Sequence, residues 1–239
     1  MKLLSRRTNV IIATILVIVI GAITYNYNNN KITELPPMTV QEKKARFISL
    51  IVPAVDHVYE DLMTQYQAVK SVIDSGESND EIEQLKIEYK ADTNKKLLMA
   101  LKPHPKSIAI AQAAMESSWA TSRFFLQANN IFGVWSFNED EPRIAANKKR
   151  GDKTIWVREY DSIEDSVYDY YRTLARGRAF VEFRQKTMET NDPHVLVKKL
   201  DRYSEKGKVY GKELTAIIKY NNFDEYDDYD HESESDEVK

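Results

Sequence analysis

An apolar run that contains one carboxylate constrains this 239-residue chain more than any other feature of its sequence. Residues from Ile108 to Trp119 are apolar on nearly every face of a helix, a pattern typical of a helix that is buried on all sides. Glu116 lies inside this run. Because ionising a carboxylate in a low-dielectric interior costs several kcal/mol, Glu116 must either be paired or have a raised pKa. A raised pKa is the property that a general acid needs.

Arg123 offers a structural alternative to a catalytic role for Glu116. It follows Glu116 by about two helical turns, so a buried ion pair between the two is compatible with the spacing. Pairs of this kind are common in structural networks. Periodicity alone therefore leaves two interpretations open, an acid with a raised pKa and a structural ion pair.

The residues around Glu116 resemble a known family. AQAAMESSWATSRF, followed by ANNIFGVW, is similar to the glucosaminidase family of peptidoglycan hydrolases (glycoside hydrolase family 73), whose members read QAALESGWGxS and then NNLFG. The match is closest to the Bax-like branch, proteins of Gram-negative bacteria with a membrane-proximal N-terminus, and it covers residues 41–221. It implies a mainly α, lysozyme-like α+β fold in which a small β-lobe lies across a cleft from the catalytic helix. The chain departs from the family at Ser118 and Ala120, where Gly is usual.

The resemblance also suggests the remaining site residues. Glu116 would be the general acid, and Tyr210 in KVYGKEL matches a tyrosine that lies near the reacting sugar in the family. The second group would be a carboxylate of the β-lobe, with Glu139, Asp140 and Glu141 as candidates, or the acetamide of the substrate itself. The side chains that we expect to bind sugar are Asn130, Phe132, Trp135 and Trp119. The same patterns also fit core packing for Trp119 and Tyr210, a chain turn at Asn130, and solvated surface charge for the loop acids.

Composition argues against several other kinds of site. The chain has no cysteine, which excludes disulfides and thiolate sites, and His57 and His104 stand alone, so we expect neither a metal nor a cofactor. Residues 222–239 hold nine Asp or Glu and one Lys, which leaves the remainder with a net charge of +5 against −3 for the whole chain. That weakly basic body beside an acidic tail argues against a nucleic-acid partner.

The N-terminus predicts export from the cytoplasm. Lys2, Arg6 and Arg7 precede an apolar run from Val10 to Ile23, which is typical of a signal sequence or a single membrane-spanning helix. We interpret residues 1–25 as an uncleaved anchor and residues 26–37 as a polar linker. The body would then lie in the periplasm, held at the inner membrane, or would be secreted if the N-terminus is cleaved.

The rest of the chain divides into three parts. Apolar periodicity predicts a helical hairpin over residues 38–102, with helices at 40–70 and 82–101, that either braces the next domain or binds a partner. The catalytic domain would span residues 103–221, with a loop at 136–152, a short strand at 153–159, a helix capped by Asp161 or Ser162, and two amphipathic helices within 195–218. Residues 222–239 are too polar to fold alone and are predicted to be a disordered acidic tail that could recruit a protein.

Three functions fit these observations. The first is a membrane-tethered endo-β-N-acetylglucosaminidase that cleaves β-1,4 bonds of peptidoglycan glycan strands, with no amidase activity. A lytic transglycosylase would use the same acid but form a 1,6-anhydro product. A non-catalytic glycan-binding or scaffold protein would not need Glu116 at all.

Overall fold

The computed structural model describes residues 35–77, 79–150 and 153–227. The chain divides into Met1–Pro36 and Pro37–Lys239, and the fold is that of the second unit. The predicted anchor and nearly all of the predicted linker lie outside the described residues. Within the described part, no helix is both long enough and apolar enough to cross a bilayer.

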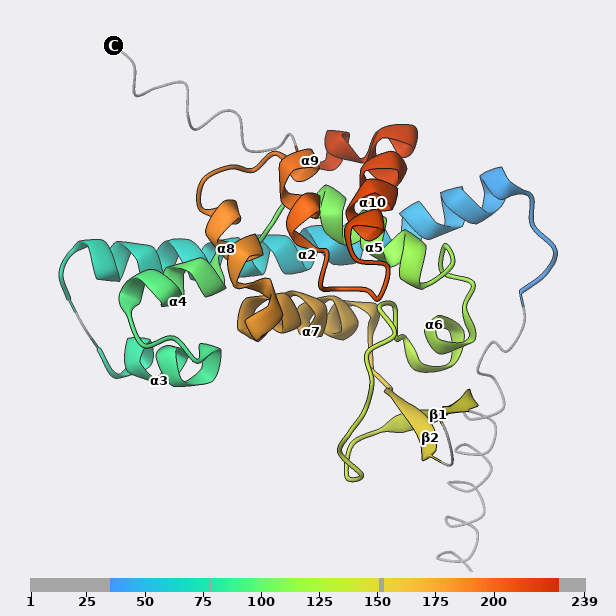
Figure 1. Ribbon diagram of the computed structural model, residues 1–239, viewed down its shortest axis with the longest axis horizontal. Helices are drawn as coiled ribbons and strands as arrows, with labels where there is room; N and C mark the ends of the chain where they lie inside the picture. Colours follow the sequence, from blue (N-terminus) through green and yellow to red (C-terminus); the bar gives the residue numbers. More distant parts are fainter. Residues whose placement is uncertain (1–34, 78, 151–152, 228–239) are drawn as a thin grey trace, which may run out of the picture. The chain divides into compact units, whose positions relative to one another are not determined.

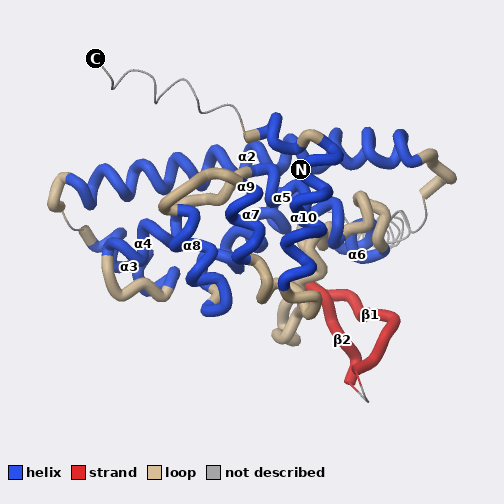
Figure 2. Tube along the Cα trace, turned by 45° about the horizontal axis from the view of Figure 1, so that its top comes forward, coloured by secondary structure: helices blue, strands red, loops and turns tan. Residues whose placement is uncertain are grey.

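The described part of the second unit is mainly helical with one two-stranded sheet, as predicted (Figure 1). Its α-helices are α2 (Val40–Asp74), α3 (Asp80–Tyr89), α4 (Asn94–Leu101), α5 (Lys106–Glu116), α6 (Arg123–Ala128), α7 (Ile163–Arg176), α8 (Val181–Thr187), α9 (Pro193–Leu196) and α10 (Lys208–Asn221). The strands are β1 (Arg143–Arg150) and β2 (Lys153–Arg158), and the 3-10 helices are η1 (Arg178–Phe180), η2 (Val197–Lys199) and η3 (Phe223–Tyr226). Figure 2 shows the hairpin of β1 and β2 projecting from the helices.

Helix α2 belongs to the same hydrophobic core as the buried helix α5. Thr39 and Glu42 form a capping box that starts α2, and the helix runs along the helical body in Figure 1. Its first half packs Phe47, Ile51 and Val55 into the cluster that also holds the apolar face of α5. Its second half forms a smaller cluster with α3 and α4. The apolar stripe of the predicted hairpin is therefore buried within the protein, which supports the bracing role over a free partner-binding arm.

The prediction of one continuous helix over residues 82–101 was wrong. The structure breaks it into α3 and α4, because Lys90 takes a left-handed conformation with φ of 55° and ends α3. The Thr93 hydroxyl then accepts a hydrogen bond from the Lys96 amide and caps α4. Tyr89 and Leu97, on either side of the turn, are eight positions apart and keep a helical spacing, so periodicity did not detect the break between them.

Helix α5 is buried as predicted but ends earlier, at Glu116. Ser118, Trp119 and Ala120 follow with φ values of 53°, 63° and 57°, all left-handed. The turn is held because the Ser117 hydroxyl accepts from the Ala120 amide, and Arg46 of α2 donates to the Ala120 carbonyl. Placing Trp119 on the same helix as Glu116 was therefore wrong. The left-handed turn also explains why glycine suits positions 118 and 120, since glycine adopts positive φ without steric cost.

Ser118→Gly is expected to stabilise the protein by about 0.5–1 kcal/mol, because Ser118 is an exposed residue in a left-handed conformation that glycine adopts without steric cost. Thermal unfolding measures the change as a rise of a few degrees. Thr121→Gly is the matched control three residues later, where φ is not positive and the hydroxyl donates to the Ser118 carbonyl, so it should lower the unfolding temperature. Equal effects of the two changes would contradict this reading of the turn.

The predicted loop at residues 136–152 contains a strand. β1 pairs antiparallel with β2, with Ile144 opposite Val157 and Ala145 opposite Trp156, and the register shifts between Ala145 and Lys149. Trp135 adds an isolated bridge to Val157. β1 was missed because its sequence is mostly polar, without the alternation of a half-buried strand; its partner β2 supplies the order. The strand predicted at 153–159 is confirmed as β2.

The C-terminal third is a mixture of agreement and correction. Helix α7 starts as predicted, with Ser162 as its N-cap. Of the two helices predicted within 195–218, α10 is long, but the first is reduced to the four-residue α9 followed by η2, and α8 was not predicted. The acidic tail begins later than predicted, because η3 buries Phe223 in the core and Asp227 accepts a hydrogen bond from the Ser107 amide at the start of α5. Residues 228–239 lie outside the described part.

Candidate active site

Glu116 ends α5 beside the first turn of α10. Its Oε1 accepts a hydrogen bond of 2.9 Å from the Tyr210 hydroxyl, 94 residues further along the chain. No described residue donates to its other oxygen, Oε2. The side chain is only partly exposed, so the carboxyl is largely removed from water while one oxygen remains free for a ligand.

Burial raises the pKa of Glu116 above its ordinary value, while the Tyr210 hydrogen bond and the positive charge of Lys206 oppose the rise. The alternative of an ion pair with Arg123 is excluded. The Arg123 guanidinium donates instead to Gln127 Oε1 and to the Ala145 carbonyl. A raised pKa without a paired cation is the condition that the sequence predicted for an acid.

Tyr210 is fixed in place by its neighbours. It is buried, and its ring stacks on Tyr203 with centroids 5.3 Å apart and planes 17° apart. Gly211 lets α10 approach η2 closely, since a Cβ there would lie 2.6 Å from the Val197 carbonyl oxygen. Burial and the negative charge of Glu116 raise the pKa of Tyr210 well above 10.0. Its hydroxyl therefore keeps its proton at neutral pH and serves as a hydrogen-bond donor.

Two further residues adjoin this pair that sequence reasoning did not select. Gln112, one helical turn before Glu116 on α5, donates from Nε2 to the Tyr210 hydroxyl at 2.9 Å. Its Oε1 accepts from the Tyr170 hydroxyl at 2.6 Å. Gln112 and Tyr170 are both buried. The available signal was a second polar residue four positions before Glu116, on the same face of an otherwise apolar helix.

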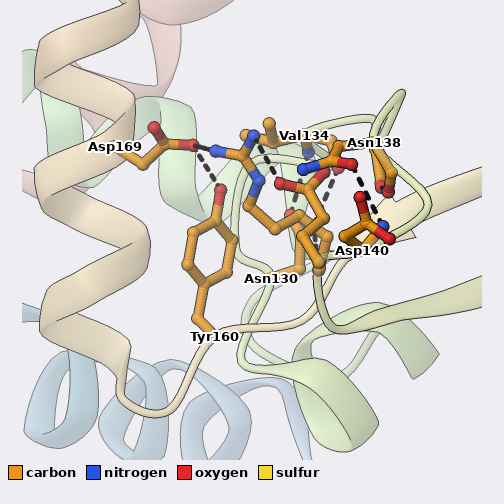
Figure 3. A network of polar contacts seen from close by, with 9 residues as sticks. Asn130, Val134, Asn138, Asp140, Tyr160 and Asp169 are labelled. Atoms are coloured by element: carbon orange, nitrogen blue, oxygen red, sulfur yellow. Dashed lines mark hydrogen bonds and ion pairs between the residues drawn. The ribbon is translucent and has the colours of Figure 1, made fainter.

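The candidate loop acids differ in their surroundings. The Glu141 carboxylate lies 3.0 Å from the Arg158 guanidinium, and a hydrogen bond from Ser136 together with Arg158 lowers the pKa of Glu141. Glu139 is 88% exposed and lies 3.5 Å from Arg143. Asp140 is exposed and its amide donates to the Asn138 side chain (Figure 3). None of the three contacts Glu116, and their catalytic role stays a prediction.

Asn130 and Phe132 shape the loop between α6 and the sheet. The Asn130 side chain donates from Nδ2 to the Val134 and Arg158 backbone carbonyls (Figure 3). Its Oδ1 accepts from the Val134 backbone N–H. Phe132 is buried and stacks on Tyr170, with centroids 4.0 Å apart. Asn130 therefore turns the chain, and Phe132 supports the tyrosine that contacts Gln112. Direct sugar contact by either stays a prediction.

The two candidate tryptophans lie in different environments. Trp135 is 41% exposed and stands beside Phe137, which is 83% exposed, so the β-lobe presents a pair of aromatic faces to solvent. Trp119 instead packs its ring edge-on against Phe47, 5.1 Å away, and near Phe223. Trp135 has the exposure that sugar stacking requires, whereas Trp119 is engaged in core contacts.

A family model for glucosaminidases, described as mannosyl-glycoprotein endo-beta-N-acetylglucosaminidase, matches residues 95–223, more than half of the chain. The chain belongs to the glucosaminidase family. It is 26% identical over 220 residues to Protein bax of Escherichia coli (strain K12), across 82% of this chain and 78% of that protein. The resemblance to the Bax-like branch is thereby confirmed.

Two solved structures are also similar to this chain. The catalytic domain of the autolysin Auto from Listeria monocytogenes is 17% identical with a TM-score of 0.43, over 81% of this chain and 100% of that one. A peptidoglycan hydrolase from Sphingomonas sp. A1 is 20% identical with a TM-score of 0.43, over 55% of this chain and 84% of that one. The family match begins at residue 95, near the start of α4, so α2 and α3 precede it, although α2 packs into the same core as α5.

Proposed function

We propose that this glucosaminidase hydrolyses β-1,4 glycosidic bonds of peptidoglycan glycan strands, as an endo-β-N-acetylglucosaminidase with Glu116 as general acid. The observation that carries the proposal is the Glu116 carboxyl itself, which is largely buried, lacks a cationic partner among the described residues and has a raised pKa. Family membership supplies the reaction class. Peptidoglycan follows from the resemblance of the AQAAMESSWATSRF block to hydrolases of the cell wall.

The surroundings of Glu116 suit both halves of a proton transfer. Burial keeps the acid protonated until substrate arrives, and Oε2, which has no described partner, would give its proton to the leaving oxygen. The resulting carboxylate would then be stabilised by the Tyr210 hydroxyl on Oε1 and by the charge of Lys206. The same contacts that limit the rise in pKa thus stabilise the product of the transfer.

The group opposite the acid is either a β-lobe carboxylate or the acetamide of the substrate. Glu141 is the loop acid whose pKa is lowered, so it is ionised at neutral pH and able to stabilise a positively charged carbon. Its carboxylate is, however, already paired with Arg158. The acetamide route needs no second carboxylate, and it agrees with a Glu116 whose described partner is a tyrosine.

Tyr210→Phe is expected to move the alkaline limb of the kcat profile to higher pH. Removing the hydroxyl removes a contact that favours the ionised form, so the pKa of Glu116 rises and the acid stays protonated over a wider range. The loss of product stabilisation should also lower kcat by about tenfold. Rates measured across pH 4–9 check both effects, and an unchanged alkaline limb would show that Tyr210 does not act on Glu116.

Product analysis tests the proposed function. Purified protein is incubated with peptidoglycan, and the released fragments are identified by mass spectrometry. Reducing N-acetylglucosamine ends are expected from a glucosaminidase, whereas 1,6-anhydro-N-acetylmuramic acid ends would identify a lytic transglycosylase. The second outcome is a real alternative, because one acid without a contacting carboxylate also suits that reaction. If no fragments are released, the remaining interpretation is a non-catalytic glycan-binding or scaffold protein.

We also propose that the protein is anchored in the inner membrane with its catalytic body in the periplasm. The support is the sequence of residues 1–25, with Lys2, Arg6 and Arg7 on the cytoplasmic side of the apolar run. Recovery in the membrane fraction after alkaline washing is expected. Release of a shortened chain into the soluble fraction would indicate cleavage, and a protein bound to the acidic tail would appear by cross-linking in intact cells.

A further inference from the structure

Glu116 is the last member of a directed chain of hydrogen bonds. Tyr170 donates to Gln112 Oε1 at 2.6 Å, Gln112 Nε2 donates to Tyr210 at 2.9 Å, and Tyr210 donates to Glu116 Oε1 at 2.9 Å. Tyr170, Gln112 and Tyr210 are at most 1% exposed, so water cannot replace these partners. Each member donates in one direction, toward Glu116.

The two ends of the Gln112 amide decide this direction. A tyrosine hydroxyl can donate or accept at the same site, but a carboxamide accepts only at oxygen and donates only at nitrogen. With Nε2 facing Tyr210, the Tyr210 oxygen must accept, and its proton is directed to Glu116 Oε1. With the amide reversed, Tyr210 would donate to Gln112 and present a lone pair to Glu116. The acid proton would then sit on Oε1, bound to Tyr210 and unavailable to substrate.

Tyr170 is the buried partner of the Gln112 amide oxygen in the observed orientation. The Tyr170 ring stacks on the ring of Phe132, with centroids 4.0 Å and planes 12° apart. It also makes an edge contact with the His104 ring, at a centroid distance of 5.5 Å. Its hydroxyl is therefore fixed opposite Gln112 Oε1. A reversed amide would still bond to both hydroxyls, but it would take the Tyr210 proton away from Glu116 and so break the Tyr210–Glu116 hydrogen bond whenever Glu116 is ionised.

We infer that Gln112, whose amide oxygen is bound by Tyr170, is a positioning residue that makes Tyr210 a donor to Glu116 Oε1 and so keeps the acid proton on Oε2. The inference rests on the proposed function, since it explains how the acid of that reaction presents its proton. It gives a reason for a glutamine at this fully buried position of α5.

Gln112→Met and Gln112→Glu test the inference in opposite ways. Methionine preserves volume but cannot donate to Tyr210, so kcat on the plateau of the pH profile should fall about 10- to 100-fold with KM unchanged. The carboxyl introduced by Gln112→Glu can imitate the amide while it is protonated, accepting from Tyr170 and donating to Tyr210. Once ionised, this carboxylate accepts from both tyrosines and turns the Tyr210 proton away. Gln112→Glu should therefore keep kcat within about threefold at acid pH and lose it above a new ionisation in the profile.

Tyr170→Phe and Tyr171→Phe provide a matched pair on α7. Tyr170→Phe leaves the buried Gln112 amide oxygen without its partner, which loosens the amide and should lower kcat about tenfold. Tyr171 is also buried, but its hydroxyl makes only a 3.4 Å contact with the His104 carbonyl and takes no part in the chain, so kcat should not change. Unfolding temperatures measured for both variants separate an effect on the acid from an effect on folding.

Titration of the Glu116 carboxyl carbon by ¹³C NMR gives a readout that does not need turnover. Gln112→Met should raise the pKa of Glu116 above that of the wild type, because Tyr210 is no longer directed at it. If the wild type is active but kcat, KM and the titration are unchanged in Gln112→Met, the positioning role is overturned and the proposed function stands. If the wild type releases no fragments from peptidoglycan, the proposed function itself fails.

Discussion

Glu116→Gln is expected to slow the release of glycan fragments from peptidoglycan by about 10²- to 10⁴-fold, the range that a general acid contributes. Glutamine has nearly the same shape, and its Oε1 can still accept from the Tyr210 hydroxyl. It has no acidic proton to give to the leaving oxygen. The measurement is the initial rate of new reducing ends, with KM expected to change little because the side chain is replaced by its isostere.

A folding defect can be separated from this loss of activity. Because burial raises the pKa of Glu116, the folded state binds a proton more tightly than the unfolded state, and the wild type loses stability as pH rises above the unfolded value near 4.5. Glutamine does not titrate, so the variant should equal or exceed the wild type in unfolding temperature at pH 7, with the difference disappearing at acid pH. An inactive variant with this stability profile identifies Glu116 as the acid.

Glu205→Gln is the matched control, since Glu205 is an exposed carboxylate in the turn before α10. It should have wild-type activity and stability. Retained activity of Glu116→Gln at more than a tenth of the wild-type rate would remove Glu116 from the mechanism and leave the scaffold interpretation.

Phe47→Ala is expected to lower the free energy of unfolding by about 3–5 kcal/mol. Phe47 is fully buried on α2, and its ring meets Trp119 at 5.1 Å, in the turn that follows Glu116. Removing the ring leaves a cavity between α2 and that turn. For a protein of this size, the loss corresponds to a fall of about 10 °C or more in unfolding temperature.

The prediction tests whether α2 is part of the catalytic body, because Phe47 precedes the region that matches the family. Ile87→Ala on α3 is the control, since Ile87 is 80% exposed and its truncation should change stability by less than about 0.5 kcal/mol. Phe47→Ala is expected to unfold in a single cooperative transition at a lower temperature, and activity should be lost in that same transition. An unaffected transition would show that α2 contributes little to the core.

Local pattern was sufficient wherever burial follows the helical period. The apolar run after Pro105 predicted α5, and the mismatch of one carboxylate in that run selected Glu116. The N-cap Ser162 likewise marked the start of α7. β1 was missed because it is mostly polar and is ordered by pairing with β2. The break between α3 and α4 was missed because Tyr89 and Leu97 keep a helical spacing across the turn.

The sequence by itself determined that a buried helix carries a carboxylate, and its resemblance to the family suggested that Tyr210 lies at the same site. Only the tertiary structure decided how that acid is held. The hydrogen bonds that direct its proton join Gln112 to Tyr170 and Tyr210, 58 and 98 residues away, and the direction depends on which end of an amide faces which hydroxyl. Periodicity records which residues are buried, because burial follows from each residue's own polarity. It carries no information on which buried polar groups meet, because that depends on the packing of α5, α7 and α10 together.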